Sequence, residues 1–141
     1  MNSNIANKIH WSFWVIGIFM LLWNVMGCIN FVVQMNPEMV AAYRESEQAM
    51  IQNRPLWSTI GFVIAVFGGT LGCVLLLLKK STAFYLFVAS FIGVVITTLH
   101  ALALGVQFEM GEVIGVIMMP SVVALFLIWY IQYCKTKDWL N

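Results

Sequence analysis

Charged side chains are scarce in this chain. Only 9% of the 141 residues are Asp, Glu, Lys or Arg, whereas a soluble domain carries about a quarter. This low content, together with 62% hydrophobic residues, excludes an ordinary water-soluble domain. The formal net charge is only +1 and no long basic cluster occurs. We therefore expect no nucleic-acid partner, because binding to phosphates requires several clustered Lys or Arg residues.

The scarce charges leave four long uncharged runs. They cover residues 9–37, 55–78, 81–108 and 113–134, with lengths of 29, 24, 28 and 22 residues. Each run exceeds the roughly 20 apolar residues that a helix needs to cross a bilayer core. The sequence therefore predicts an all-α fold, a four-transmembrane-helix antiparallel bundle that forms a single integral membrane domain over residues 1–141. We expect the helices at about 11–33, 56–78, 82–104 and 112–134, in contact with the lipid bilayer.

Motifs that carry enzymatic chemistry are absent from the sequence. It has no HExxH, no glycine-rich phosphate loop, no Cys-x-x-Cys and no Ser or Cys nucleophile with a neighbouring base. We therefore predict no enzymatic activity, no metal site and no cofactor. The three cysteines, Cys28, Cys73 and Cys134, lie in or at the end of apolar runs, and we interpret them as small buried thiols.

The basic residues predict the orientation in the membrane. Lys and Arg concentrate in the cytoplasmic loops of membrane proteins. Two arginines, Arg44 and Arg54, fall between the first and second runs, and the five lysines fall on the other side: Lys8, Lys79, Lys80, Lys135 and Lys137. This distribution predicts a multi-pass protein with both termini in the cytoplasm.

The first loop is the only long one, and it opens with a helix start. Asn36 is a suitable N-cap, Pro37 suits the first helical position, and Glu38 places an acid in the first turn. We expect a short amphipathic helix at about 37–52 on the extracellular or periplasmic side, ending before Pro55. It could lie on the membrane surface, or act as a lid or partner-binding helix.

Small residues at spacings of four predict where helices pack closely, because close backbone approach holds helices together in lipid. The second and third spans each present such a face, which we interpret as intrachain packing or, alternatively, as a self-association surface. The residues are Gly61, Ala65, Gly68, Gly69 and Gly72 in the second span and Ala89, Gly93, Thr97 and Ala101 in the third. In the fourth span, Pro120 removes a backbone hydrogen bond and predicts a kink.

Four polar residues are candidates for a pocket. His100 is an ionisable group within a span, which makes it a candidate functional residue. Asn24 lies near the middle of the first span, and Asn30 and Glu112 fall at the depth of His100. We predict an outward-facing polar pocket of these four residues. The alternatives are a structural His100–Glu112 contact and an interhelical hydrogen bond from Asn24.

Several segments resemble a family of small bacterial four-span inner-membrane proteins. The similarity rests on HWSFWVIG at 10–17, LWNVMG at 22–27, RPLW at 54–57, GGTLG at 68–72 and LLLLKK at 75–80. The resemblance implies a bacterial origin and a location in the inner (cytoplasmic) membrane, and some members carry a sugar-transporter label. The chain is also similar in size to four-span small multidrug transporters, but those rely on an acid in the first helix, where this sequence has Asn24.

These observations lead to two functional hypotheses. The first is a non-enzymatic accessory or structural component of the inner membrane, which binds another membrane-protein partner. The second is the protomer of an oligomeric small-solute transporter, because four helices are few to enclose a pathway and a homo-oligomer would supply more. A water-filled cavity at Asn24, His100 and Pro120 would favour transport.

Overall fold

The computed structural model describes residues 8–141, all of whose regular structure is helical. In chain order the helices are α1 (Trp11–Val33), α2 (Pro37–Val40), α3 (Glu45–Gln52), α4 (Leu56–Leu77), α5 (Ala83–Ala103), α6 (Met110–Glu112), the π-helix η1 (Val113–Met118) and α7 (Met119–Thr136). The last three are continuous, and this segment, α1, α4 and α5 are each long and apolar enough to cross a membrane. The predicted all-α fold with four spans and an intervening short helix is confirmed: the chain is a multi-pass integral membrane protein.

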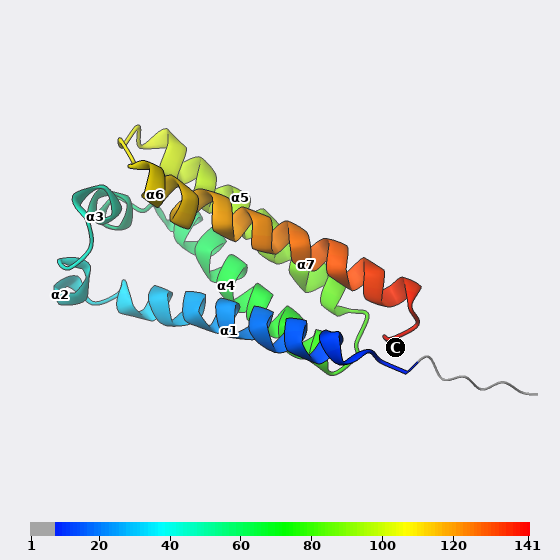
Figure 1. Cartoon of the computed structure of the whole chain (residues 1–141). Coiled ribbons are helices and arrows are strands. Elements are labelled where there is room, and N and C mark those ends of the chain that lie inside the picture. Colours follow the sequence, from blue (N-terminus) through cyan, green and yellow to red (C-terminus); the bar gives the residue numbers. More distant parts are fainter. Residues whose placement is uncertain (1–7) are drawn as a thin grey trace, which may run out of the picture.

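The central pair of helices organises the bundle. α4 packs against both α1 and α5, and α5 also packs against α7, whereas α1 and α7 make no extensive contact in the described part of the chain. Figure 1 shows α1 and α7 farther apart beside α2 and α3 than near the chain termini. We call the end of the bundle beside α2 and α3 the α3 end. The opposite end, near the chain termini, is the lysine end, because Lys79, Lys80, Lys135 and Lys137 lie there.

The tight core lies at the lysine end. Phe13 from α1, Leu76 from α4, Phe87 from α5 and Ile131 from α7 are at most 1% exposed and belong to one cluster. These side chains fill the space where the four spans converge. The bundle is therefore packed solid at the lysine end, while the α3 end has room for a cavity.

α4 and α5 approach through small residues. A methyl group added at Gly93 would lie 2.6 Å from the backbone nitrogen of Ala65, and one added at Gly61 would lie 2.5 Å from a side-chain carbon of Ile96. Glycine is thus required at both crossing points. Gly68 also faces α5, but a methyl group there would have ordinary contacts, the nearest at 3.6 Å.

The remaining small residues take different positions. Gly72 packs under the ring of Phe87 on α5. A methyl group at Gly69 would contact two helices, because it would meet the side chain of Asn24 on α1 and the hydroxyl of Ser90 on α5. Ala89 is only half-buried, whereas Thr97 and Ala101 line the cavity described below. The small residues of α5 therefore have two roles. Those at the centre of the helix pack against α4, and those toward the α3 end form part of the cavity wall.

Two expected helices differ in detail. Instead of one helix over 37–52, the loop forms α2 and α3, separated by a turn at 41–44. Asn36 caps α2 as predicted, since its Oδ1 accepts from the N–H of Glu38 at 3.0 Å. In the fourth span, the distortion caused by Pro120 takes the form of the π-helix η1, which ends just before the proline. A wider turn accommodates the missing N–H and the bulk of the proline ring.

The outward faces of the spans are apolar. On α1, the side chains of Phe19, Leu22, Met26 and Ile29 are each more than half exposed. In water such a large apolar surface would promote aggregation, whereas in a membrane it contacts lipid chains. This face agrees with the predicted bilayer contact.

Candidate binding cavity between the four spans

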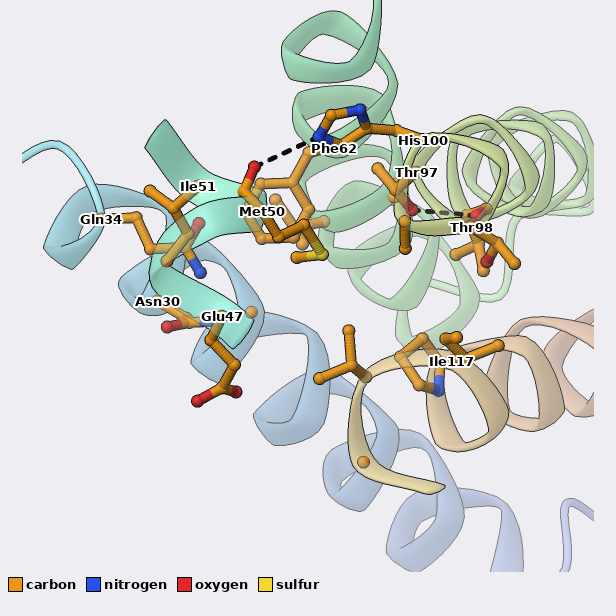
Figure 2. Close-up of a pocket in the computed structure, with 18 of the residues that line it drawn as sticks. Asn30, Gln34, Glu47, Met50, Ile51, Phe62, Thr97, Thr98, His100 and Ile117 are labelled. Atoms are coloured by element: carbon orange, nitrogen blue, oxygen red, sulfur yellow. Dashed lines mark hydrogen bonds between the residues drawn. The ribbon is translucent and has the colours of Figure 1, made fainter. Parts of the chain in front are cut away.

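A cavity of about 780 Å³ lies between the spans at the α3 end. This volume is within the range of roughly 300–1,000 Å³ that small-molecule sites occupy. Every span contributes to its wall, and α3 covers part of it, as Figure 2 shows. Its inner limit is Leu127, which also belongs to the core at the lysine end.

The structure brings all four candidate pocket residues to the wall of this one cavity. Asn24 and Asn30 come from α1, His100 from α5 and Glu112 from α6, and Pro120 lies on the same wall. Asn24, His100 and Glu112 are buried, whereas Asn30 is exposed. The four do not contact one another as a cluster, because each bonds to a different neighbour.

His100 is held by α3. Its Nε2 lies 3.2 Å from the carbonyl oxygen of Met50, drawn as a dashed line in Figure 2, and its ring meets the ring of Trp57 edge-on at 5.7 Å. A carbonyl only accepts, so Nε2 carries the proton and donates. The second ring nitrogen, Nδ1, then has an acceptor lone pair when the imidazole is neutral.

Glu112 also bonds to α3 rather than to His100. The hydroxyl of Ser46 donates to one carboxylate oxygen, and the backbone N–H of Glu109 donates to the other at 2.7 Å. The second bond is half of a capping box that begins α6. Within residues 8–141, no hydrogen bond or ion pair joins Glu112 to His100. Both side chains instead fasten α3 to the bundle.

Two further contacts tie the α2–α3 segment to the spans. Tyr43 donates its hydroxyl to Asn30 Oδ1 at 2.6 Å, and Arg44 forms an exposed ion pair with Glu109 at 2.8 Å. The amide oxygen of Asn30 thus anchors the loop. The α2–α3 segment is a cover linked to α1 and to the α5–α6 connection.

Asn24 forms the deep polar part of the wall. Its Nδ2 donates to the carbonyl of Met20 at 2.8 Å and lies 3.7 Å from the sulfur of Cys73. Nearby, Ser90 donates to the carbonyl of Ala65 at 2.6 Å, which links α5 to α4. Asn24 therefore makes a helix contact and lines the cavity at the same time, so both interpretations of this residue have a structural basis.

Arg54 is a cavity residue that sequence reasoning counted only as a loop charge. Its Nη2 donates to Gln34 Oε1 at 2.7 Å, and its guanidinium lies 4.9 Å from the ring centre of Phe62. Among the described residues it has no carboxylate partner. Burial lowers the pKa of Arg54 below its usual value, because a partly desolvated cation is less stable than one in water.

Ser58 is the second cavity residue that sequence reasoning missed. It is 1% exposed, and its hydroxyl has no hydrogen-bond partner among residues 8–141. Helical hydroxyls usually donate to the carbonyl four residues earlier, and Thr59, Thr70 and Ser121 do so here. In the sequence, Ser58 is a hydroxyl residue in the first turn of an apolar span, and Arg54 precedes the N-cap Pro55, so no helical spacing links the two residues.

The wall combines an apolar lining with a few polar groups, a composition that small-molecule sites commonly have. Most lining residues are apolar, and a few polar groups converge near α3. Within residues 8–141, no group of three or more His, Cys, Asp or Glu residues is placed to hold a metal ion. In comparisons with known proteins, no family model, no curated protein and no solved structure matches this chain.

Proposed function

We propose that this protein binds a small amphipathic solute in the cavity between its spans. The observation that carries the proposal is the combination of a cavity of about 780 Å³, a mainly apolar wall and polar groups gathered at one end. Ligand sites are typically built in this way. The binding would require no covalent chemistry, in keeping with the expectation of a non-enzymatic protein.

Exposed lining residues on α1 and η1 support a lateral opening of the cavity toward the bilayer, and hence an amphipathic rather than a fully polar solute. Met26 on α1 and Gly115 on η1 both line the cavity and are both exposed. Because α1 and α7 lack an extensive contact, a solute could enter between them from the bilayer. The positive-inside rule supports an outward-facing α3 end, and the resemblance to bacterial inner-membrane proteins supports the periplasm as the compartment that it faces.

Transport is one use of such a site. A cavity near one end and a packed core at the other correspond to one state of an alternating-access cycle. Four spans per chain would then require a homo-oligomer to enclose a pathway. The protomer of a small-solute transporter is therefore the form of the proposal that the cavity favours.

A specific observation favours the accessory role as a second candidate. At the lysine end, the N–H of Asn141 donates to the carbonyl of Lys79 at 2.7 Å, and the N–H of Ser81 donates to the carbonyl of Asn141 at 2.9 Å. These bonds fasten the segment after α7 to the α4–α5 turn. A transporter must open this end, whereas an accessory subunit that only holds its solute need not.

Binding is tested with a variant that obstructs the cavity. A side chain at Gly115 would begin in open space, since an added Cβ meets no atom within 4 Å, so Gly115→Trp should narrow the opening without a backbone clash. The matched control is Leu125→Trp, which adds the same side chain on the lipid face of α7, at a position 53% exposed.

The probe is radiolabelled decanol, measured with protein in nanodiscs and corrected with empty nanodiscs. We expect saturable binding by the wild type and by Leu125→Trp, and loss of binding in Gly115→Trp. Equal probe uptake by all three proteins and by empty nanodiscs would overturn the proposal. Proteoliposome uptake of the bound probe then separates transport from an accessory role.

A further inference from the structure

The charged residues that line the cavity, Arg44, Arg54, Glu47 and Glu112, balance in number but differ in their partners. Arg44 has Glu109 as a partner, and the carboxylate of Glu112 already accepts two hydrogen bonds. Glu47 also lines the cavity, but Figure 2 shows its carboxylate directed away from Phe62 and His100. Arg54 is a half-buried cation that contacts the amide of Gln34 and the ring of Phe62 and has no carboxylate partner within residues 8–141.

The start of α4 adds two features that favour an anion beside Arg54. α4 has no side-chain hydrogen bond capping its first turn, and the N-terminus of a helix carries a partial positive charge. Ser58, in the first turn of α4, holds a buried hydroxyl that has no hydrogen-bond acceptor within residues 8–141. An oxygen anion would accept hydrogen bonds from both side chains and satisfy groups that this chain leaves unpaired.

The wall beyond Ser58 is mainly apolar, and its two polar side chains, Asn24 and Ser90, already donate to backbone carbonyls. Phe62, Ala65 and Val66 follow on α4, and Leu127 closes the far end. From Ser58 to Ala65 the helix rises about 10 Å, at about 1.5 Å per residue. This distance suits the extended chain of a medium-length acid.

From these observations we propose that the cavity binds a single-chain amphipathic acid, with its carboxylate between Arg54 and Ser58 and its apolar chain directed toward Leu127. The inference rests on the proposed binding function and names its ligand class. Arg54 supplies the charge and Ser58 the hydroxyl donor. The lateral opening lets the chain enter from the bilayer while the carboxylate stays near the α3 end.

The test compares three probes that differ only in the head group: decanoate, decanol and decylamine. Binding is measured for the full chain in nanodiscs of zwitterionic lipid at pH 8, with empty nanodiscs to correct for partitioning. We expect decanoate to bind at least about tenfold more tightly than decanol, the ratio that about 1.4 kcal/mol of charge-assisted hydrogen bonding supplies. Decylamine should bind most weakly, because its charge repels Arg54.

Variants assign the preference to its residues. Arg54→Gln should abolish the preference of decanoate over decanol, whereas Lys80→Gln, which removes one positive charge at the other end of the bundle, should retain it. Arg54→Lys should keep the preference, because it retains the positive charge, and Arg54→Met takes the place of Arg54→Gln if that variant does not fold. Ser58→Ala should weaken decanoate binding while the unliganded protein stays as stable as the wild type or becomes more stable, because a buried hydroxyl without a partner is removed.

The outcomes separate this inference from the proposed function. If decanol and decanoate bind equally and Arg54→Gln changes neither, the acid specificity is refuted but the cavity remains a binding site. A preference for decylamine refutes the acid and assigns the specificity to Glu47 or Glu112. If no probe binds above the empty-nanodisc level, both proposals fail. Loss of stability in Ser58→Ala without a change in decanoate affinity would show that Ser58 has only a structural role.

Discussion

Gly93→Ala should separate α4 from α5 and destabilise the bundle. The added methyl group would lie 2.6 Å from the nitrogen and 3.0 Å from the Cα of Ala65, and closer still to the carbonyl oxygen of Gly61. All three atoms belong to the backbone of α4, so none can rotate away as a side chain would. The two helices must therefore move apart at their closest point.

The magnitude follows from two opposing effects. Overpacking a well-packed site costs about 1–3 kcal/mol, and rigid backbone neighbours favour the upper part of that range. Replacing a helical glycine by alanine gains up to about 1 kcal/mol through helix propensity. The net expectation for Gly93→Ala is a loss of about 1–2 kcal/mol of unfolding free energy.

Gly68→Ala is the matched control on the facing helix. Its added methyl group would have its nearest contact at 3.6 Å, from the carbonyl oxygen of Leu86, so only the propensity gain applies and stability should hold or rise. The assay is reversible unfolding in mixed micelles with increasing SDS, followed by circular dichroism. Equal stability of Gly93→Ala and Gly68→Ala would refute the packing argument, because their difference rests entirely on the backbone contacts.

Three further predictions concern the surface and the ends of the bundle. Arg44→Gln should lower the unfolding free energy by less than about 1 kcal/mol in the same assay, because both members of the Arg44–Glu109 pair are more than half exposed. A larger decrease would mean that this ion pair is needed to hold α3 in place. Lys79→Gly should raise the unfolding free energy by about 1 kcal/mol, because Lys79 follows α4 with a φ of 61°, a conformation that glycine adopts without strain. A decrease would show that the contact of the Lys79 ammonium with the Trp14 ring stabilises the protein more than the backbone strain destabilises it. In a variant lacking the native cysteines, a thiol at Gln52 should react with an impermeant reagent outside intact cells and one at Lys80 should not; the reverse pattern would invert the proposed orientation.

The fold could be predicted largely because span formation is a local property. A helix in lipid satisfies its own backbone, so a long uncharged run is sufficient to identify a span. The expected 11–33, 56–78 and 82–104 differ from α1, α4 and α5 by at most one residue at either end. The helix over 37–52 was less accurate, because the turn at 41–44 depends on contacts such as Tyr43 with Asn30, which no local pattern encodes.

The candidate site was only partly predictable. Polar residues in an apolar run stand out, so Asn24 and His100 could be singled out and both lie on the cavity wall. Their partners could not be deduced, because His100 bonds to a backbone carbonyl of α3, and any residue offers such a group. Arg54 and Ser58 sit at a helix start where polar residues are common, so their lack of partners becomes visible only in three dimensions.

The sequence by itself determined the number of spans, the limits of α1, α4 and α5 to within one residue, and the small-residue contact of α4 with α5, because each follows from hydropathy or spacing along one or two helices. Only the tertiary structure decided that α1 and α7 stay apart at the α3 end, that α3 covers the gap between them, and that a cavity remains there. The physical reason is that lipid solvates every apolar face equally well. Apolar faces alone therefore do not specify which helices meet, and the contacts of a few glycines and polar side chains decide the arrangement.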